Sequence, residues 1–424
     1  MTIVQYAAII ISAAVVISYL NYRYIKMQAT IAIMASALLL SLILLLTKWF
    51  GVTSLRYLAQ SFVLHIDFHR LVMNFMLGLL LFAGSLTINI SHFRSQKIEI
   101  GVLTSITTIL SAFLIAFLTY LFLGLIGVHF DFIYCMLFGS LISPTDPVAV
   151  LAIFKKLGTP KRLETLVSSE SLFNDGVGVV LFVTCYQVAF SSQAATVSGV
   201  IGLFFKEAAG GVLYGMLLGW ICCLLMKPVN DHKVKILLTI ALVTGGYTLA
   251  QALQISGPLA MVAAGIIVSN YKRGETMSKF SRGELNNFWE LIDELLNTVL
   301  FLLLGLELLV VTFDWRKFVA LFVMIPLVLL VRYITVATPM AVLSRWRRRM
   351  PYTISILTWG GLRGGLAVAL ALSIPSGDVR DWILALTYGV VVFSIVVQGT
   401  TISGLVRLAN ASHEKHKANL KSLK

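Results

Sequence analysis

The chain has 424 residues, of which 58% are hydrophobic and 12% are charged, and its mean hydropathy is +0.91. Soluble globular domains carry about 25% charged residues, so this composition excludes an ordinary soluble enzyme and indicates an all-α polytopic membrane protein. The net charge of +14 lies mainly in loops between apolar segments. We interpret it as a signal of membrane topology rather than of nucleic-acid binding.

Apolar segments that are long enough to cross about 30 Å of hydrocarbon, roughly 20 residues each, recur along the whole chain. They predict one transmembrane domain over residues 1–407 and a short basic cytoplasmic tail at 408–424. The thirteen segments that we expect to span the membrane are 3–20, 28–47, 71–90, 98–127, 132–154, 165–192, 197–226, 236–252, 256–270, 287–311, 316–341, 353–375 and 381–406.

The number of basic residues alternates from loop to loop. Loops after odd-numbered segments, together with the tail, contain 24 of the 33 Lys and Arg residues, whereas loops after even-numbered segments contain 7. Because short cytoplasmic loops carry an excess of Lys and Arg, we expect the N-terminus outside the cell and the C-terminus in the cytoplasm. An arrangement with twelve or fourteen segments would destroy this alternation.

A carboxylate interrupts the fifth segment, where residues 143–147 read SPTDP around Asp146. The two prolines have no amide proton, so the carbonyls of Ser140 and Ser143 lose their helical partners and the helix should unwind. Unwound backbone at membrane depth is stable only where it is buried in protein or lines a watery cavity. Its carbonyl oxygens and the carboxylate would then suit a small cation. The alternative is a simple proline kink.

The sixth segment carries a polar face in the stretch ESLFNDGVGVV, which begins at Glu170. At about 100° per residue, its polar side chains fall within an arc of about 140°. They are Glu170, Asn174, Ser171 and Asp175. A buried helix with such a face has to meet other polar groups. For Glu170, the alternative is a solvated helix end near the cytoplasm.

The acids of these two segments favour ion exchange. The negative charge of a carboxylate is unfavourable outside bulk water. It is neutralised when the carboxylate binds either a proton or a metal cation. If one site binds either ion but not both, and opens to each side in turn, the two ions are exchanged across the membrane. Asp146, Glu170 and Asp175 are the residues that we expect to carry this exchange.

The twelfth segment contains a second break, TWGGLRGGLAVAL, in which two glycine pairs flank Arg363. It lies seven segments after the first break, as expected for two inverted six-helix repeats, 3–192 and 236–406, joined by the segment 197–226. In such repeats the broken helices cross at the membrane midplane. Arg363 could offset exposed helix ends or pair with an acid. The alternative is that its side chain extends to the membrane surface.

Arg332 occupies a similar place in the eleventh segment. We expect it to pair with an acid of the tenth segment, and we interpret such a pair as structural rather than as part of a transport pathway. The candidate partners are Glu307, Glu290, Asp293 and Glu294.

Four motifs together resemble sodium/proton exchangers of the NhaP type, the prokaryotic relatives of the animal NHE exchangers in the cation:proton antiporter superfamily. They are SPTDPVAV from Ser143, ESLFNDGVGVV from Glu170, FLLLGLEL from Phe301 and GLRGGLAVALAL from Gly361. The similarity covers nearly the whole chain. It implies a thirteen-helix inverted repeat that works as a homodimer in the cell membrane of a bacterium or archaeon. Such a protein binds monovalent cations, protons and membrane lipid, and uses no cofactor.

The resemblance also implies which residues bind Na⁺. They are Asp146, Glu170, Ser171 and Asp175, with the backbone around Thr145 contributing. Three further residues would support the site: Asn174, Arg332 and Arg363. The Asn-Asp pair at 174–175 implies electroneutral exchange of one Na⁺ or Li⁺ for one H⁺, because electrogenic relatives carry Asp-Asp there.

Two positions depart from the pattern of the family. Ala83 stands where many members have an acid, and Gln251 stands where they often have Glu. Those acids usually serve as partners for buried arginines or as regulatory groups. The departures leave the partners of Arg332 and Arg363 open, and they imply an altered pH dependence.

Three other functions remain as alternatives to Na⁺/H⁺ exchange. A K⁺/H⁺ antiporter would have the same fold, and a passive cation channel would carry current where a one-for-one exchanger carries none. An intramembrane aspartyl protease would need two opposed aspartates in that family's own motifs, which we do not find in this sequence.

Overall fold

Helices make up almost all of the described chain. The computed structural model describes residues 3–47, 59–63, 65–88, 96–190, 197–273, 277–343 and 352–422, and no strand beyond an isolated bridge occurs within these ranges. Elements labelled η are short π- or 3₁₀-helical turns. In chain order the elements are α1 (Ile3–Leu20), η1 (Asn21–Ile25), α2 (Ala29–Leu46), α4 (Phe68–Leu71), η3 (Val72–Met76), α5 (Leu77–Leu86), α7 (Lys97–Gly101), η4 (Val102–Ile106), α8 (Thr107–Leu125), α9 (Phe132–Ile142), α10 (Val148–Leu157), α11 (Lys161–Phe190), α12 (Val197–Met226), α13 (His232–Ala252), α14 (Gly257–Arg273), α15 (Lys279–Leu306), η5 (Glu307–Leu309), α16 (Trp315–Leu343), α17 (Thr353–Trp359), α18 (Gly365–Leu372), α19 (Asp378–Phe393), η6 (Ser394–Gln398) and α20 (Gly399–Ser422).

Every predicted segment coincides with a helix or with a run of helices. Nine helical stretches among the described residues are long and apolar enough to cross a membrane, so the chain is an all-α multi-pass membrane protein, as predicted. The thirteen crossings, the inverted repeat and the domain boundary at residue 407 stay predictions. Residues 89–90, 191–192 and 423–424, at the ends of two predicted segments and of the predicted tail, lie outside the described residues.

The fifth and twelfth segments are each broken into two short helices, as predicted. The fifth forms α9 and α10, which are separated by residues 143–147, and the twelfth forms α17 and α18, which are separated by residues 360–364. The breaks fall at the proline pair and at the glycine pairs, the residues that helices tolerate least. By contrast, α20 continues without a break to Ser422, so the predicted tail prolongs the helix of the thirteenth segment.

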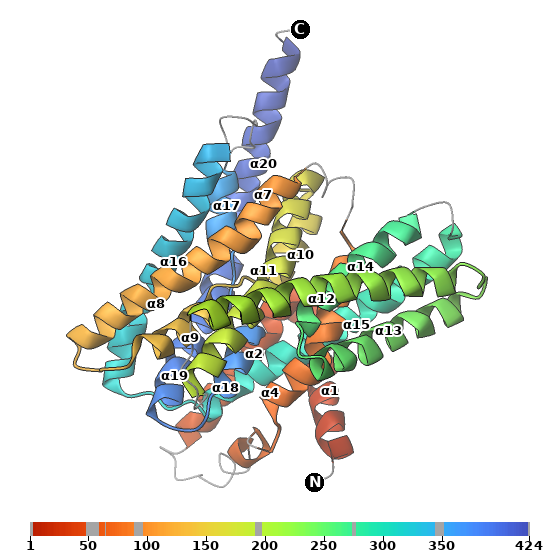
Figure 1. Cartoon of the computed structure of the whole chain (residues 1–424). Coiled ribbons are helices and arrows are strands. Elements are labelled where there is room, and N and C mark those ends of the chain that lie inside the picture. The colour runs from red at the N-terminus through yellow and green to blue at the C-terminus, as the bar shows by residue number, and fades with distance from the viewer. Residues whose placement is uncertain are drawn as a thin grey trace.

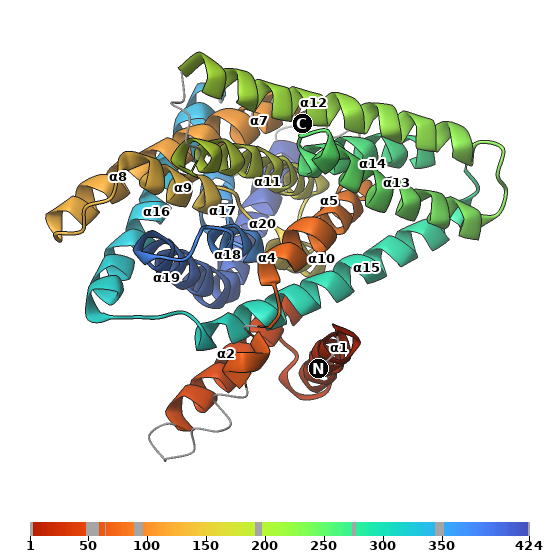
Figure 2. The ribbon, with the colours of Figure 1, turned by 60° about the horizontal axis from the view of Figure 1, so that its bottom comes forward.

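The two broken segments lie near the middle of the molecule, between two groups of helices. In both views α8 and α16 lie on one side, α13 and α14 lie on the other, and α11 and α18 lie between them (Figures 1 and 2). Large apolar side chains cover the outside, such as Phe322 on α16, which is 82% exposed, and Leu213 on α12, which is 66% exposed. An apolar surface of this extent fits contact with lipid.

Helix α12 approaches α14 closely along a row of glycines. Cβ atoms on three glycines of α12 would come within 3 Å of backbone atoms at the start and along the length of α14, so a side chain there would force the helices apart. The facing pairs are Gly211 with Ser256, Gly215 with Ala260, and Gly219 with Ala264.

We predict that Gly215→Leu destabilises the protein by about 1–3 kcal/mol or more, the usual effect of overpacking. The reason is that the new side chain would collide with the backbone of Ala260, which cannot rotate away. Thermal unfolding in detergent measures the effect. Gly202→Leu is the matched control on the same helix, because no atom lies within 4 Å of a Cβ at Gly202. Equal melting temperatures for the two variants would contradict the prediction.

Candidate cation site

The breaks in the fifth and twelfth segments lie directly against each other. The backbone N–H of Asp146 donates to the carbonyl of Leu362 over 2.7 Å, and the two residues form an antiparallel bridge. A Cβ atom on Gly364 would overlap the Asp146 side chain, so this close approach requires glycine at that position. The structure therefore brings the two broken segments into contact, as the sequence predicts.

Arg363 binds the backbone carbonyls that follow α9, where the fifth segment is broken. Its guanidinium donates to the carbonyl oxygens of Ser143 and Pro144 over 2.6 and 2.7 Å, and only 3% of the residue is exposed. The carbonyl of Ser143 is one that the SPTDP prolines leave without a helical partner, and the hydroxyl of Ser143 donates to the other, at Ser140, over 3.3 Å. A positive charge at a helix C-terminus also compensates the helix dipole. Arg363 therefore offsets exposed helix ends, and it does not extend to the membrane surface.

The polar face of α11 contacts the same break through Asn174. Its amide nitrogen donates to the hydroxyl of Thr145 over 2.9 Å and to the carboxylate of Glu170 over 3.0 Å, and its amide oxygen accepts from the Thr145 N–H over 3.2 Å. The hydroxyls of Thr145 and Ser171 lie 3.1 Å apart. All four residues are buried. Asn174 thus fixes the unwound backbone to α11 with both ends of its side chain.

Arg332 binds Glu170, so the prediction that its partner is an acid of the tenth segment is wrong. Its Nη2 lies 2.9 and 3.0 Å from the two carboxylate oxygens, and both side chains are 2% exposed. Helix α16, which carries Arg332, packs against α17. Arg332 therefore also reaches the carbonyl of Leu357, which lies in the last turn of α17, over 3.2 and 3.3 Å.

The four acids of the tenth segment that were predicted as partners of Arg332 have other surroundings. Glu307 is buried in the turn η5 after α15, whereas the other three acids line a cavity. Those three are Glu290, Asp293 and Glu294. We call Thr145, Glu170, Ser171, Asn174 and Arg332 together the buried network.

The cavity has a volume of about 630 Å³ and lies among α5, α10, α11, α15 and α18. Asp146 and Asp175 line it together with Gly364, whereas the buried network does not, among the residues that the structure describes. One carboxylate oxygen of Asp146 accepts from the N–H of Val148 over 2.9 Å. Two acids therefore share one cavity with space for water.

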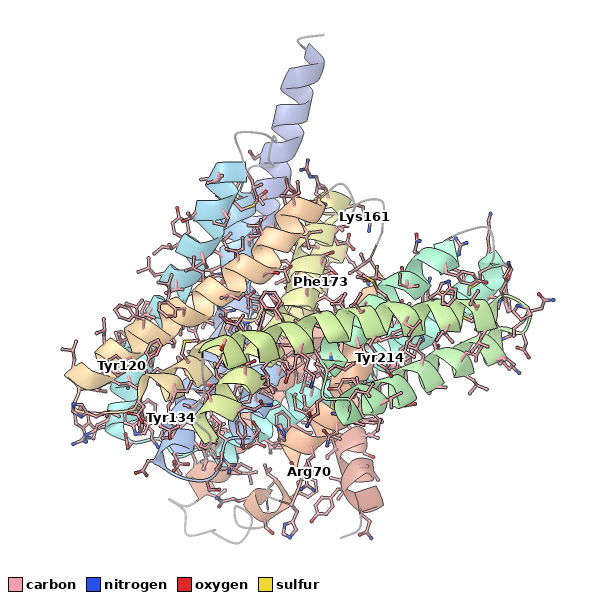
Figure 3. All side chains as sticks on the ribbon, viewed as in Figure 1. Arg70, Tyr120, Tyr134, Lys161, Phe173 and Tyr214 are labelled. Carbon is pink, nitrogen blue, oxygen red and sulfur yellow. The ribbon has the colours of Figure 1, made fainter. Side chains whose placement is uncertain are left out.

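One side of α11 follows this cavity from its exposed end inward. The lining residues of α11 recur every three or four positions; they are Lys161, Glu164, Thr165, Ser168, Leu172 and Asp175. Figure 3 labels Lys161, at the outer end of the helix, and Phe173, further along it. Asp175 lies two residues beyond Phe173, about 21 Å of helix from Lys161 at 1.5 Å per residue. The cavity therefore connects an exposed surface with the break.

The polar arc of α11 faces two different surroundings. Glu170 and Asn174, at one edge of the arc, belong to the buried network, whereas Asp175, at the other edge, lines the cavity. An arc of about 140° is wide enough for both. In the described part of the chain, no group of three or more His, Cys, Asp or Glu side chains is close enough to hold a metal ion. The predicted Na⁺ site at Asp146, Glu170, Ser171 and Asp175 stays a prediction.

The structure also shows supporting residues that the sequence reasoning missed. Ser394 in the turn η6 accepts from the N–H of Arg363 over 2.9 Å and donates to the side-chain oxygen of Gln398 over 2.8 Å. The amide of Gln398 donates to the carbonyl of Trp359, the last residue of α17, over 3.0 Å. The signal was the stretch SIVVQ, which places two polar residues four apart in an apolar segment.

The two departures from the family pattern leave neither arginine without partners. Ala83 is buried in α5, and Gln251 donates to the side chain of Asn74 over 3.3 Å. Arg332 is paired with Glu170, and Arg363 binds backbone carbonyls. Acids at positions 83 and 251 are therefore not required to compensate these two charges.

We predict strong coupling between Glu170 and Arg332. Removal of one partner from a buried ion pair leaves an uncompensated charge and costs about 3–5 kcal/mol, so Glu170→Gln and Arg332→Met should each lower the melting temperature markedly. The double variant should melt above the value expected from adding the two effects. The exposed pair Lys161–Glu164, 2.9 Å apart, is the control and should show no measurable coupling. Additive effects at Glu170 and Arg332 would contradict this assignment.

Comparison with known proteins agrees with these features. The profile of a family described as "Sodium/hydrogen exchanger, transmembrane" matches residues 9–408. The Na(+)/H(+) antiporter NhaP of Pseudomonas aeruginosa is 45% identical over 97% of this chain and 98% of its own length. The Na(+)/H(+) antiporter NhaH of Halobacillus dabanensis is 35% identical over 83% of this chain and 85% of its own length.

A solved structure has the same fold. The sodium proton antiporter MjNhaP1 from Methanocaldococcus jannaschii matches with a TM-score of 0.74 over 96% of this chain and 98% of that chain, at 16% sequence identity. At this identity the match supports the fold alone. Together with the family profile and the similarity to the relative from Pseudomonas, the fold identifies the chain as a member of the sodium/hydrogen exchanger family of transmembrane proteins.

Proposed function

We propose that this protein is a secondary active antiporter that exchanges Na⁺ or Li⁺ for H⁺ across the membrane. The observation that carries the proposal is that the carboxylates of Asp146 and Asp175 line one cavity. Two like charges in a confined space favour either a proton or a cation between them. The relatives that share most of this chain are named as Na⁺/H⁺ antiporters, which supports the choice of ions.

Within the buried network, Asn174 and Arg332 would hold the site without joining the exchange. Asn174 fixes the unwound stretch at Thr145, and Arg332 neutralises Glu170, so both residues keep the geometry around the break constant. Arg363 adds a fixed positive charge beside the exposed carbonyls. The carboxylates of Asp146 and Asp175 then remain to take a proton or a cation, as the predicted Na⁺ site requires. We propose that Ser171 and Glu170 complete this site when the ion is bound.

The alternative functions receive less support. Because the chain belongs to a family of exchangers, nothing supports an aspartyl protease. We therefore do not propose that the protein catalyses a chemical reaction. A K⁺/H⁺ antiporter would share the fold, but the relatives similar over most of this chain carry sodium in their names. A passive channel would need a continuous path, whereas exchange needs a site that faces each side in turn.

We further propose the arrangement of the protein in its membrane. The excess of Lys and Arg in loops after odd-numbered segments supports an external N-terminus and a cytoplasmic C-terminus. The family resemblance supports a homodimer in the cell membrane of a bacterium or archaeon, with thirteen crossings in two inverted repeats. In this orientation the exposed end of the cavity, near Lys161, faces the cytoplasm.

We predict that Asp175→Asn abolishes uptake of ²²Na⁺ into proteoliposomes driven by a pH gradient, because an amide can neither release a proton nor neutralise a cation. The protein should still fold, since Asn has nearly the same shape, and thermal unfolding checks this. Glu164→Gln is the control, because it removes an acid from the same side of α11 at an exposed ion pair, and it should keep its uptake. Retained uptake in a folded Asp175→Asn variant would exclude Asp175 as a carrier.

We predict that the exchange is electroneutral. An imposed potential of either sign should leave the initial rate of Na⁺ uptake unchanged, because one charge moves each way. The measurement uses proteoliposomes with valinomycin and a K⁺ gradient, and a pH-sensitive dye reports exchange with Na⁺, Li⁺ and K⁺ in turn. A rate that follows the potential would contradict one-for-one exchange, a steady current would indicate a channel, and a response to K⁺ alone would establish a K⁺/H⁺ antiporter.

A further inference from the structure

The peptide group that joins Leu362 to Arg363 is hydrogen-bonded on both of its sides. Its carbonyl, which belongs to Leu362, accepts from the backbone N–H of Asp146 over 2.7 Å. Its N–H, which belongs to Arg363, donates to the hydroxyl of Ser394 over 2.9 Å. Because a peptide group is planar and rigid, a movement of its N–H moves its carbonyl as well. The backbone of Asp146 is therefore connected to Ser394 through one rigid unit.

A chain of hydrogen bonds continues from Ser394 to the other end of the same break. The hydroxyl of Ser394 donates to the side-chain oxygen of Gln398 over 2.8 Å, and the amide nitrogen of Gln398 donates to the carbonyl of Trp359 over 3.0 Å. Ser394 is 0% and Gln398 is 2% exposed, so bulk water does not compete for these bonds. Trp359 is the last residue of α17, and Arg363 lies just before α18. The thirteenth segment therefore holds the break at both ends.

The donors and acceptors of this chain have only one consistent direction. A carbonyl oxygen only accepts, so the amide nitrogen of Gln398 faces Trp359 and its amide oxygen faces Ser394. The hydroxyl proton of Ser394 then goes to Gln398, and a lone pair of the same oxygen accepts from the N–H of Arg363. Hydrogen bonds that follow one another in this way strengthen one another. Loss of the Ser394 hydroxyl would leave a buried N–H without a partner, which is unfavourable.

The first break is held in a similar way by the segment that follows it. Asn174 of α11 binds the backbone N–H and the hydroxyl of Thr145 with the two ends of its amide. Whereas α11 also carries acids, Ser394 and Gln398 lie in the uncharged stretch SIVVQ. Neither is among the described residues that line the cavity of the two acids. They can therefore act on the exchange only through the backbone that they hold.

Binding of a cation depends more strongly than binding of a proton on the position of Asp146. A proton needs one carboxylate oxygen, whereas a metal cation is held by several oxygens at fixed distances. One carboxylate oxygen of Asp146 is bonded to the N–H of Val148, so the side chain follows its own backbone. A shift of this backbone would therefore weaken the binding of a cation before it weakens the binding of a proton.

We propose that Ser394 and Gln398 are positioning residues for the cation site, which set its affinity for Na⁺ through the peptide group between Leu362 and Arg363. Without the Ser394 hydroxyl, this peptide group is free to turn, and the backbone of Asp146 loses its fixed partner. The affinity for Na⁺ then falls, whereas the affinity for H⁺ stays nearly constant. This proposal rests on Na⁺/H⁺ exchange as the proposed function.

Transport in proteoliposomes at several Na⁺ concentrations tests this role. Ser394→Ala should raise the KM for Na⁺ about tenfold and leave kcat within about twofold, because the acids themselves are intact. At low Na⁺ concentration, inhibition of uptake by protons should begin at the same pH as in the unaltered protein. A purely structural role would instead lower the amount of folded protein, and hence the maximal rate, without changing KM. An unchanged KM in folded Ser394→Ala would overturn the proposal.

Thr387→Val is the matched control. Thr387 lies on α19 in the same segment, is 0% exposed like Ser394, and its hydroxyl has no hydrogen-bond partner among the described residues. Because valine has nearly the same shape as threonine, this variant should keep the KM of the unaltered protein. An equal rise of KM in both variants would show a general effect of losing a buried hydroxyl, and it would overturn the proposal.

Gln398→Met tests the second member of the chain. This change keeps a long unbranched side chain but removes both hydrogen bonds, so it should also raise the KM for Na⁺. Because the two residues act as one chain, the double variant with Ser394→Ala should have a KM within about twofold of that of Ser394→Ala alone. Multiplied effects would contradict the chain. Thermal unfolding checks that each variant folds, and if Ser394→Ala does not fold, the KM of Gln398→Met alone decides the question.

Deuterium uptake tests the chain without transport. Mass spectrometry of peptides that cover residues 360–364 should show faster uptake in Ser394→Ala than in Thr387→Val or the unaltered protein, because the N–H of Arg363 has lost its acceptor. Equal uptake in all three proteins would overturn the chain. Faster uptake with an unchanged KM would overturn the positioning role and leave Na⁺/H⁺ exchange standing. A lack of Na⁺ transport by the unaltered protein would overturn the proposed function instead.

Discussion

Unpaired carbonyl oxygens at the broken helices are the constraint on which the rest of this structure depends. A helix that stops inside a membrane leaves its last carbonyls without partners, and hydrocarbon offers none. Here an arginine from another segment binds the end of the first half-helix at each break. Arg363 binds the carbonyls of Ser143 and Pro144 after α9, and Arg332 binds the carbonyl of Leu357 in α17. These two guanidinium groups therefore supply hydrogen bonds that the broken helices lack.

The two arginines also differ in what they bind. Arg332 engages both oxygens of Glu170, so this carboxylate has a fixed partner, whereas Arg363 is occupied by backbone and leaves the acids around it unbound. Asp146 and Asp175 line the cavity, and neither forms a salt bridge with an Arg side chain among the described residues. The same fold thus contains one acid in a buried ion pair and two that line a cavity, although all three lie within two neighbouring segments.

Much of this arrangement follows from local sequence, and the remainder depends on which helices become neighbours. Prolines and glycines act on their own helix, so the breaks at 143–147 and 360–364 were predictable, as was the polar face of α11. The partner of Arg332 was not, because the sequence does not show whether an acid of α11 or of α15 lies beside Arg332 in the folded chain. For the same reason, no pattern shows that Asp175 lines the cavity while Glu170 does not. The spacing of Ser394 and Gln398 indicated two polar side chains on one face of their helix. Only the structure shows that Gln398 binds the carbonyl of Trp359 at the end of α17.

The bridge between Asp146 and Leu362 has a mechanical consequence. Backbone is joined directly to backbone there, and Arg363, the residue after Leu362, grips the carbonyls at the other end of the same unwound stretch. Neither of the two broken segments can therefore shift at the crossing without moving the other. During any displacement that carries the site from one face of the bilayer to the other, the acidic side chain and the guanidinium would travel as a single rigid body. Their mutual Coulomb energy would stay constant along the way, so the attraction between these two groups would not oppose that movement.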